Sequence, residues 1–443
     1  MCAIFGVFNL KNAAQVTAVG LHGNQHRAID QAGMVTSHAG AFHLKYGKGL
    51  ARQVFTPEAL AALPGENAIG HLRYPTVVDD NTRINVQPII GKYCGVPIAI
   101  AHNGNLTNVD ELAKLVHPSQ ITSSIDTEYI VRILEKRDSG NLEDDLTEVL
   151  RLLKGSFSLA IMTPYCMIAV RDRTGNRPLS IGTIEDGYCI SSETCAFPPI
   201  GTSEYHEIEP GTMEIMNSKG KHSKKFAEAD EKRCRFESIY FSHPFSVFSK
   251  EPVDESRLKI GKALAEHCPV EDGADIVTPI PDSSNFIAMG FAQQSQNCGD
   301  YFPVIIRSHY SGRTFIVNTQ ARRLSEVTQK FIFSAERIRG KRIVVIDDSI
   351  VRGNTMPTIV SLLRQLGAKA VHVRIGSPPI RYSCRYGINT PTTEELISST
   401  HSPEEIRKKV GADSLQFLPL DVLKSLSSKP ESFCYTCMNG NYW

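Results

Sequence analysis

Residues 342–355 read RIVVIDDSIVRGNT, and this stretch decides the fold of the second half of the chain. An apolar strand runs into two acids, Asp347 and Asp348, then into a turn containing Gly353, and a helix is predicted to begin before Pro357. Such a turn can aim backbone N–H groups at a phosphate, aided by the helix dipole, while the acids suit ribose hydroxyls or Mg²⁺. Helix-start charges beside a plain turn are the alternative, but the full order of residues favours a phosphate site.

The segments around this motif predict a parallel α/β domain. ADIVTPI (274–280) and KRIVVID (341–347) have the composition of buried strands. The helix that follows the second strand carries apolar residues at positions i, i+3, i+4 and i+7, namely Ile359, Leu362, Leu363 and Leu366.

The first half predicts a layered α+β or αββα domain. Short β-rich runs, separated by Gly, Asn and Pro turns, alternate with a helical pattern at 126–136. The polar, lysine-rich residues 217–233 lack apolar periodicity and predict a link between domains. We therefore expect domains at 2–232 and 233–443. The predicted strands are CAIFGVF (2–8), PIAIAHNG (97–104), SFSLAIM (156–162) and CMIAVRD (166–172).

Composition limits the class of protein. The 443 residues carry a net charge of +1 and are 41% hydrophobic. No polyanion-binding surface is evident from this balance, so we expect no nucleic acid as a partner. No long apolar run or secretory signal is evident, so we expect a cytoplasmic protein without membrane contact. The 11 cysteines, odd in number and scattered, do not resemble a disulfide framework and are better considered as thiols, metal ligands or nucleophiles.

Cys2 follows the initiator methionine directly. Removal of Met1 would leave a thiol and a free α-amine on one residue, and an α-amine with a pKa near 7.7–8.0 can act as the base for its own side chain. The alternative is a small buried residue at the start of a strand. A single cysteine does not decide between them.

The 342–355 segment resembles the phosphoribosylpyrophosphate (PRPP) motif of type I phosphoribosyltransferases. PIPDSS (279–284), SGRTFI (311–316), GAKAVHVRIGSPPI (367–380) and GADSL (411–415) narrow the resemblance to the glutamine PRPP amidotransferase family, and it extends over nearly the whole chain. The resemblance implies an N-terminal αββα sandwich of the Ntn-hydrolase type, followed by a parallel-sheet phosphoribosyltransferase domain.

The same resemblance implies the residues of a PRPP site. Mg²⁺ would be held by Ser283, Asp347 and Asp348, and a loop at 313–330 would close over PRPP. Some positions depart from the family pattern: Arg307 and His309 replace frequent basic residues, Asn354 replaces a frequent threonine, and Asn318, Glu326 and Thr328 alter the loop. The implied PRPP-binding residues are Asp347, Asp348, Ser349, Val351, Arg352, Gly353, Asn354 and Thr355, with Arg307, Arg322 and Lys330 near pyrophosphate.

With this resemblance, Cys2 matches the nucleophile of class II glutamine amidotransferases. QHRAIDQAGM, GHLRYPT, AHNGNLTN and SSIDTE follow it in the family's order. Arg73 suits the glutamine α-carboxylate because a guanidinium binds two oxygens, and Asp126 would pair with the α-ammonium. Asn103 and the N–H of Gly104 would form the oxyanion hole. Arg27, Tyr74 and Thr76 would position loops around glutamine, although Ala28 replaces the family's usual glycine.

Cys434 and Cys437 form a Cys-x-x-Cys pair, which by itself is ambiguous between a redox pair, zinc and iron–sulfur. Cys234 and Cys384 match the remaining positions at which one subgroup of the family binds a 4Fe–4S cluster. The resemblance favours this cluster in a structural role, with zinc as the less favoured occupant. Four thiols without metal are the other alternative.

The resemblance implies an enzyme that converts PRPP to 5-phosphoribosylamine with ammonia from glutamine, the first committed step of purine synthesis. Two alternatives stay open: a paralogue with a different phosphoribosyl acceptor, and a sensor of PRPP or nucleotides with impaired transferase activity. Purine nucleotide inhibitors and a homodimer or homotetramer are further expectations from the family.

Overall fold

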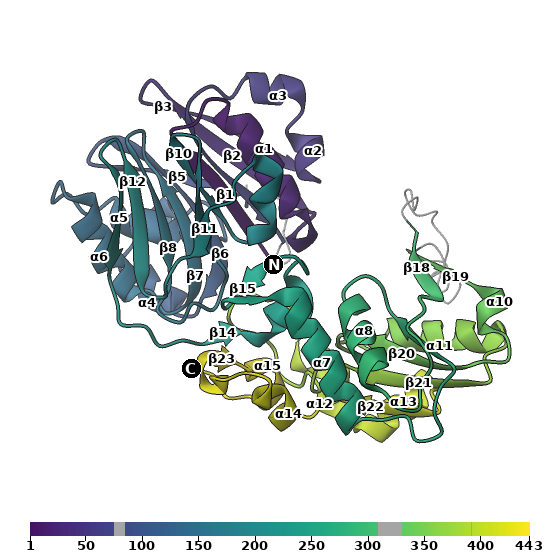
Figure 1. The fold of residues 1–443 in the computed structure, drawn as a ribbon. Helices are drawn as coiled ribbons and strands as arrows, with labels where there is room; N and C mark the ends of the chain where they lie inside the picture. The colour runs from purple at the N-terminus through teal and green to yellow at the C-terminus, as the bar shows by residue number, and fades with distance from the viewer. Residues whose placement is uncertain (75–84, 309–329, 391) are drawn as a thin grey trace.

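Two antiparallel sheets face each other in the first half of the chain (Figure 1), in a computed structural model that describes residues 1–74, 85–308, 330–390 and 392–443. One sheet has seven strands in the order β11-β9-β10-β1-β4-β2-β3, and the other has six in the order β13-β12-β8-β7-β6-β5. The strands are β1 (Ala3–Phe8), β2 (Gln31–His38), β3 (Ala41–Lys48), β4 (Asn67–Arg73), β5 (Ile89–Tyr93), β6 (Val96–Leu106), β7 (Gly155–Met162), β8 (Cys166–Arg171), β9 (Ser180–Ile184), β10 (Gly187–Ser191), β11 (Tyr205–Glu207), β12 (Thr212–Asn217) and β13 (Gly220–Lys225).

Helices cover the outer face of each sheet, which confirms the predicted αββα order. α1 packs closely on β1 because Gly20 has no side chain: a Cβ there would lie 2.4 Å from the ring of Phe5. α5 and α6 cover the six-stranded sheet with apolar faces that carry Ile130 and Leu146. The helices of this domain are α1 (Ala13–Gly23), α2 (Ala51–Val54), α3 (Pro57–Ala61), α4 (Val109–Ala113), α5 (Thr127–Leu134) and α6 (Leu142–Leu152).

The second half contains a four-stranded parallel sheet in the order β17-β20-β21-β22, as the sequence predicts. Alternate residues of β20 enter different cores, Val344 with α7 and α8 on one face, and Val345 with α11 and α13 on the other. The main elements are α7 (Val253–His267), β17 (Ile276–Pro279), α8 (Asn285–Gln294), β20 (Arg342–Asp347), α11 (Thr355–Gln365), β21 (Ala370–Ile375), α13 (Pro403–Val410) and β22 (Ser414–Phe417).

Smaller elements frame the second domain. A hairpin of β18 and β19 flanks residues 309–329, and β23 pairs in parallel with β14. Figure 1 places the N-terminus at the junction of the two domains. These elements are β14 (Arg233–Cys234), a π-helix (Glu237–Phe241), β15 (Val247–Phe248), β16 (Glu251–Pro252), β18 (Ile305–Arg307), β19 (Phe331–Phe333), α10 (Ala335–Ile338), α12 (Ile397–Thr400), α14 (Leu420–Ser425), β23 (Phe433–Cys434) and α15 (Thr436–Asn439).

The prediction that the lysine-rich residues 217–233 link the two domains is wrong in part. They do not form a link throughout, because residues 220–225 are strand β13, which pairs with β12 at the edge of the six-stranded sheet. Its side chains are mostly exposed, so no apolar periodicity marks the strand, and lysines on an edge strand discourage pairing with other chains. Among the described residues, no helix is both long and apolar enough to cross a membrane.

Candidate active sites

A cavity of about 280 Å³ lies at the edge of the sandwich, beside the start of β1. Most of its lining comes from the first domain, and Gly387 comes from the second. Five of the residues predicted for glutamine chemistry line it together: Cys2, Arg73, Tyr74, Gly104 and Asp126. Thr76 lies outside the described residues.

Met1 precedes Cys2 and is held inside the protein. Its side chain is 3% exposed, and Arg177 Nη1 donates a hydrogen bond to Met1 Sδ over 2.9 Å. Burial lowers the pKa of the Met1 α-amine to about 6. Loss of Met1 would vacate this space and place the free amine on Cys2, beside the thiol.

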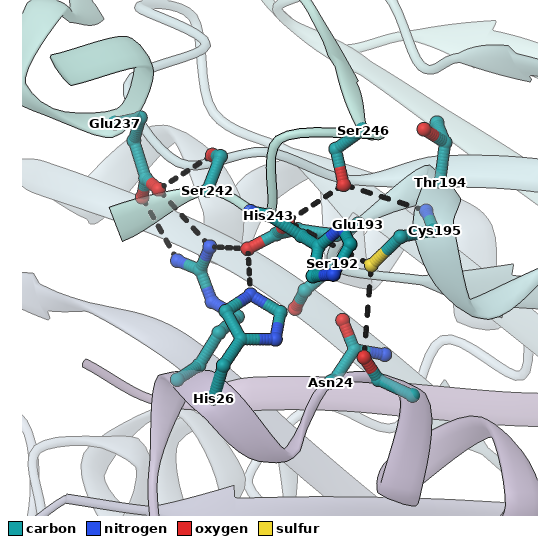
Figure 2. A network of polar contacts seen from close by, with 12 residues as sticks. Asn24, His26, Ser192, Glu193, Thr194, Cys195, Glu237, Ser242, His243 and Ser246 are labelled. Carbon is teal, nitrogen blue, oxygen red and sulfur yellow. Dashed lines mark hydrogen bonds and ion pairs between the residues drawn. The ribbon is translucent and has the colours of Figure 1, made fainter. Parts of the chain in front are cut away.

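Arg27 lies beneath Cys2 rather than in the cavity lining. Its Nε donates to the Cys2 carbonyl over 3.0 Å, and its other nitrogens bind Glu193 and Glu237, the latter at 2.8 Å. Figure 2 shows Glu193 and Glu237 converging here with His26, Ser242 and Ser246. Burial by itself would lower the pKa of Arg27, but Glu237 and Glu193 raise it above its ordinary value. The guanidinium therefore stays charged and holds the backbone of Cys2.

Glu237 joins a second buried cation to this network. Arg177 Nη1 lies 3.1 Å from Glu237 Oε1, and both side chains are almost fully buried. Burial would raise the pKa of Glu237, but Arg27 and Arg177 lower it overall. Likewise, burial would raise the pKa of Glu193, but His26 and Arg27 hold it well below its usual range. The charges of two arginines and two carboxylates thus neutralise one another beneath the N-terminus.

Asn103, the predicted oxyanion donor, is buried next to Gly104 and is not among the residues that line the cavity. Side chains alternate along β6, and Ala101 belongs to the core between the sheets, so Asn103 faces the same space. It is 1% exposed, and within the described part of the chain neither its side-chain nitrogen nor its oxygen has a hydrogen-bond partner. An unsatisfied buried amide costs about 1–3 kcal/mol, which a bound oxyanion would offset.

Gly104 cannot be replaced without moving the backbone. A Cβ at this position would lie 2.0 Å from the carbonyl oxygen of Ser156 and 2.6 Å from His102 Nε2. The close approach of β6 and β7 thus requires glycine beside the cavity.

Asp126 is oriented by a histidine that the sequence analysis did not single out. His102 Nδ1 lies 3.3 Å from Asp126 Oδ1, and the backbone N–H of Leu106 donates to Asp126 Oδ2 over 2.8 Å. Burial would raise the pKa of Asp126, but His102 lowers it overall; burial would lower the pKa of His102, but Asp126 raises it. Asp126 is therefore a carboxylate at the cavity wall. A fixed anion at this wall suits a bound ammonium group.

Arg73 ends β4 and is buried at the cavity. Its Nη1 donates to the backbone carbonyl of Asn85 and lies 3.4 Å from Gln31 Oε1. Tyr74 follows it and is exposed. The cavity therefore has a cation at Arg73 and an anion at Asp126, as an amino-acid ligand requires.

The acids of the second site come together at the carboxyl end of β20. Ser283 Oγ donates to Asp348 Oδ2, and Ser349 Oγ donates to Asp348 Oδ1 over 2.7 Å. Burial and the neighbouring charge of Asp348 raise the pKa of Asp347 well above its ordinary value, and burial raises the pKa of Asp348 as well. Paired acids and a hydroxyl are the donors that Mg²⁺ prefers, so the residues fit such an ion.

The predicted phosphate turn runs from these acids to the N-terminus of α11. Gly353 has φ +69°, and a Cβ there would lie 2.5 Å from Ile397 Cδ1, so both conformation and space call for glycine. Asn354 precedes the helix and Thr355 begins it, while Val351 accepts a backbone hydrogen bond from Ile397 over 3.0 Å. The turn is thus fixed against α12, with free helix N–H groups at its end.

Two of the predicted pyrophosphate residues, Arg307 and Lys330, lie at the β18–β19 hairpin. Arg307 ends β18 and forms an exposed ion pair with Asp282 at 2.8 Å, and exposed Lys330 directly precedes β19. In the phosphate turn, Arg352 pairs with Glu395 at 3.3 Å. Arg322 and the altered loop positions His309, Asn318, Glu326 and Thr328 lie outside the described residues.

The four predicted metal-binding cysteines share one neighbourhood. Cys234 in β14 lies opposite Cys434 in β23, and the backbone N–H of Tyr386 donates to Cys384 Sγ over 3.3 Å. Burial raises the pKa of Cys437 well above its ordinary value, with added effects of Cys234, Cys384 and Cys434. Thiols are the donors that a thiolate-bound group requires, so the four cysteines fit such a group by donor chemistry. Across the described ranges, however, no three His, Cys, Asp or Glu side chains are arranged to hold a metal ion.

The residues that the sequence analysis missed are mainly those that hold others in place. His102 lies inside the AHNGNLTN segment, so its position beside Asn103 was an available signal. Glu193 and Glu237 gave no such signal in the sequence, because they lie 166 and 210 residues from Arg27, their partner. Only the folded chain brings these charges together.

Residues 72–199 match the family model of a glutamine amidotransferase domain. The chain is 40% identical over 450 residues to the amidophosphoribosyltransferase of Bacillus subtilis (strain 168), covering 100% of this chain and 94% of that protein. It is 41% identical over 447 residues to the chloroplastic amidophosphoribosyltransferase of Vigna aconitifolia, covering 100% and 91% respectively.

Among solved structures, the chain resembles a glutamine PRPP amidotransferase from B. subtilis complexed with ADP and GMP. The TM-score is 0.91 at 40% identity, covering 100% of this chain and 97% of that chain. The sandwich and the cavity beside Cys2 define the class of glutamine amidotransferases with an N-terminal cysteine nucleophile. Within that class, the chain belongs to the amidophosphoribosyltransferase family.

Proposed function

We propose that this chain converts PRPP and glutamine to 5-phosphoribosylamine, glutamate and pyrophosphate, the first committed step of purine synthesis. The main support for this proposal is that one chain contains both sites. They are the charged cavity beside Cys2 and the acid pair that leads into the predicted phosphate turn. We assign glutamine chemistry to residues 2–232 and phosphoribosyl transfer to residues 233–443.

In the first half-reaction, the Cys2 thiol attacks the side-chain carbonyl carbon of glutamine. The Cys2 α-amine, free once Met1 is removed, takes the thiol proton and passes it to the leaving nitrogen, so that ammonia departs and a thioester remains. Water then cleaves the thioester to glutamate. Asn103 and the N–H of Gly104 stabilise the oxyanion, while Arg73 and Asp126 hold the α-carboxylate and α-ammonium. Arg27, Tyr74 and Thr76 position the surrounding backbone and loops.

In the second half-reaction, ammonia passes within the protein to PRPP. A C–N bond forms at the ribose carbon C1 as the bond to pyrophosphate breaks. Asp347 and Asp348 bind the ribose hydroxyls, while Arg307, Arg322 and Lys330 bind pyrophosphate. Residues that cradle the 5-phosphate are Ser349, Val351, Arg352, Gly353, Asn354 and Thr355.

Two inorganic groups complete the proposal. Ser283, Asp347 and Asp348 would hold Mg²⁺, which when bound neutralises pyrophosphate charge. Cys234, Cys384, Cys434 and Cys437 would hold a 4Fe–4S cluster in a structural role, with zinc as the less favoured occupant. The reaction itself needs no electron transfer.

We further propose inhibition by purine nucleotides, a homodimer or homotetramer, and a cytoplasmic location. The first is supported by the solved relative complexed with ADP and GMP. The proposed reaction is tested by supplying PRPP and Mg²⁺ with either glutamine or ammonia. Both nitrogen sources are expected to release pyrophosphate and form 5-phosphoribosylamine. Release with neither would show that the proposed reaction is wrong.

A further inference from the structure

One short segment of the second domain lies directly against the strand that carries the predicted oxyanion hole. Asn105 Nδ2 donates to the carbonyl of Arg385 over 3.0 Å, and Ser156 Oγ donates to the carbonyl of Tyr386 over 2.7 Å. Asn105 is in β6 and Ser156 is in β7, opposite it in register. The 385–387 segment therefore contacts both strands beside Gly104.

Gly387 makes the closest approach. A Cβ on Gly387 would lie 3.0–3.1 Å from the Cα, carbonyl carbon and carbonyl oxygen of Gly104, and its φ is +102°. Gly387 also lines the cavity that contains Cys2. Backbone from the second domain is thus packed on backbone of the glutamine site, with no side chain between them.

The 385–387 segment is itself held in place. The rings of Tyr386 and Trp443 stack with centroids 3.8 Å apart and planes 4° apart, and Tyr386 OH donates to the carbonyl of Trp443 over 2.7 Å. On its other side, the N–H of Tyr386 donates to Cys384 Sγ over 3.3 Å. The segment is thus anchored at Tyr386, its middle residue, and an anchored segment can hold its neighbour in a defined position.

Ser156 connects this support to the reacting centre. It is fully buried, and its carbonyl oxygen would lie 2.0 Å from a Cβ on Gly104, which places the two backbones in contact. An oxyanion donor must lie about 2.7–3.1 Å from the oxyanion, and a misplacement of about 1 Å can cost about a hundredfold in rate. Support on both sides of Gly104 therefore bears on the chemical step.

We propose that the 385–387 segment positions the oxyanion-binding strand, so that glutamine hydrolysis depends on the second domain even when PRPP chemistry is not being measured. The inference rests on the proposed function of Cys2, Asn103 and Gly104. Gly387, Tyr386 and Ser156 act through Gly104 and are positioning residues.

The test compares Gly387→Ala with Gly411→Ala. Gly411 also has a left-handed φ, +78°, but no atom lies within 4 Å of a Cβ there. We expect Gly387→Ala to lower kcat for glutamine by about 10–100-fold, with KM for glutamine nearly unchanged because Arg73 and Asp126 are untouched. Gly411→Ala should match the unaltered protein. A normal kcat in Gly387→Ala would overturn the inference.

Two internal readouts separate positioning from damage to the fold. Ammonia-dependent release of pyrophosphate and alkylation of Cys2 by iodoacetamide need no oxyanion hole, so both are expected to keep their rates in Gly387→Ala. Loss of ammonia-dependent activity in parallel with glutamine activity would contradict a specific positioning role. If the unaltered protein itself releases neither glutamate nor pyrophosphate, the proposed function has failed rather than this inference.

Ser156→Ala gives a gentler version of the test. It removes the hydrogen bond to Tyr386, whereas Ser432→Ala, in the second domain, removes a 2.8 Å bond to the carbonyl of Lys429. Both serines are buried. We expect a severalfold fall in kcat for glutamine in Ser156→Ala alone. Equal kcat values for glutamine in the two variants would show that the hydrogen bond from Ser156 to Tyr386 does not help to position Gly104.

Discussion

Cys2 shows how far a proposed nucleophile can be predicted from the sequence segments that accompany it. A second-position cysteine is ambiguous, but the segments around Arg73, Asn103 and Asp126 give it a chemical context. The fold brings Arg73 and Asp126 to the cavity that Cys2 lines, whereas Asn103 is buried behind the cavity lining. His102 was missed although it lies beside Asn103. Its role depends on a 3.3 Å contact with Asp126 that exists only after β6 and α5 pack together.

Cys2→Ala removes the nucleophile and leaves the second site intact. We expect glutamine-dependent activity to fall by more than about 10⁴-fold, because no thioester can form. Pyrophosphate release with free ammonia should stay within about twofold of the unaltered protein. Glutamate release by the variant, measured with a glutamate dehydrogenase assay, would show that the nucleophile has been wrongly assigned. Mass spectrometry of the unaltered protein should show that Met1 is absent.

Asp347→Asn tests the charge at the second site through pH. The folded protein raises the pKa of Asp347 above its ordinary value of 3.8, so the folded state holds this proton more tightly than the unfolded chain does. The free energy of unfolding therefore falls as the pH rises above 3.8 and through the raised pKa. Without Mg²⁺, we expect the variant to have the higher Tm at pH 8, and the difference to shrink as the pH falls toward about 4. Differential scanning calorimetry checks this.

Mg²⁺ provides the control for that experiment. It should raise the Tm of the unaltered protein and have little effect on Asp347→Asn. Identical Tm values without Mg²⁺ at pH 8 would contradict a raised pKa of Asp347 beside Asp348.

Helices and strands with clear periodicity were predicted correctly, and the exception has a physical cause. β20 and α11 bury regular apolar faces, which their residues reveal. β13 is an exposed edge strand, so apolar and polar residues do not alternate along it. Its lysine-rich sequence therefore predicts a link between domains instead of a strand. The π-helix Glu237–Phe241 was not predicted either. Its residue Glu237 pairs with Arg27 and Arg177 of the other domain, and such distant pairs leave no signal in the local sequence.

Glu237→Gln tests this junction. Glu237 is 0% exposed and pairs with Arg27 and Arg177, so loss of its charge leaves two buried guanidinium groups undercompensated. We expect the free energy of unfolding to fall by about 3–5 kcal/mol in urea titrations. Glu404→Gln is the matched control, because Glu404 pairs with Arg407 on the surface at 2.7 Å and its loss should leave the midpoint unchanged. Equal midpoints for both variants would refute a stabilising role of the buried network.

Gly353→Ala tests the phosphate turn. Forcing a Cβ into a left-handed conformation costs about 1–2 kcal/mol, and here it also presses on Ile397. We expect KM for PRPP to rise about tenfold or more, since 1.4 kcal/mol is a factor of ten. Gly367→Ala has a comparable φ of +90°, with its nearest atom at 3.4 Å, and should leave KM for PRPP unchanged. A similar KM in both variants would exclude this turn from the PRPP site.

At the scale of the whole molecule, the sequence predicts two domains and two chemistries but not how they meet. The N-terminus lies at the junction, Met1 packs into a core of the second domain, and Gly387 of that domain reaches the glutamine cavity. No local pattern encodes such contacts, since they join residues far apart in the chain. The fold thus places Cys2, the proposed nucleophile, where residues of both domains surround it.

The most direct test of the account is to measure glutamate and pyrophosphate together, with purified protein, Mg²⁺ and glutamine, in the presence and absence of PRPP. We predict equal molar release of both products when PRPP is present, because each ammonia made beside Cys2 is used at Asp347 and Asp348. Glutamate release without matching pyrophosphate would contradict a coupled amidotransferase and would point to a different acceptor or to independent sites.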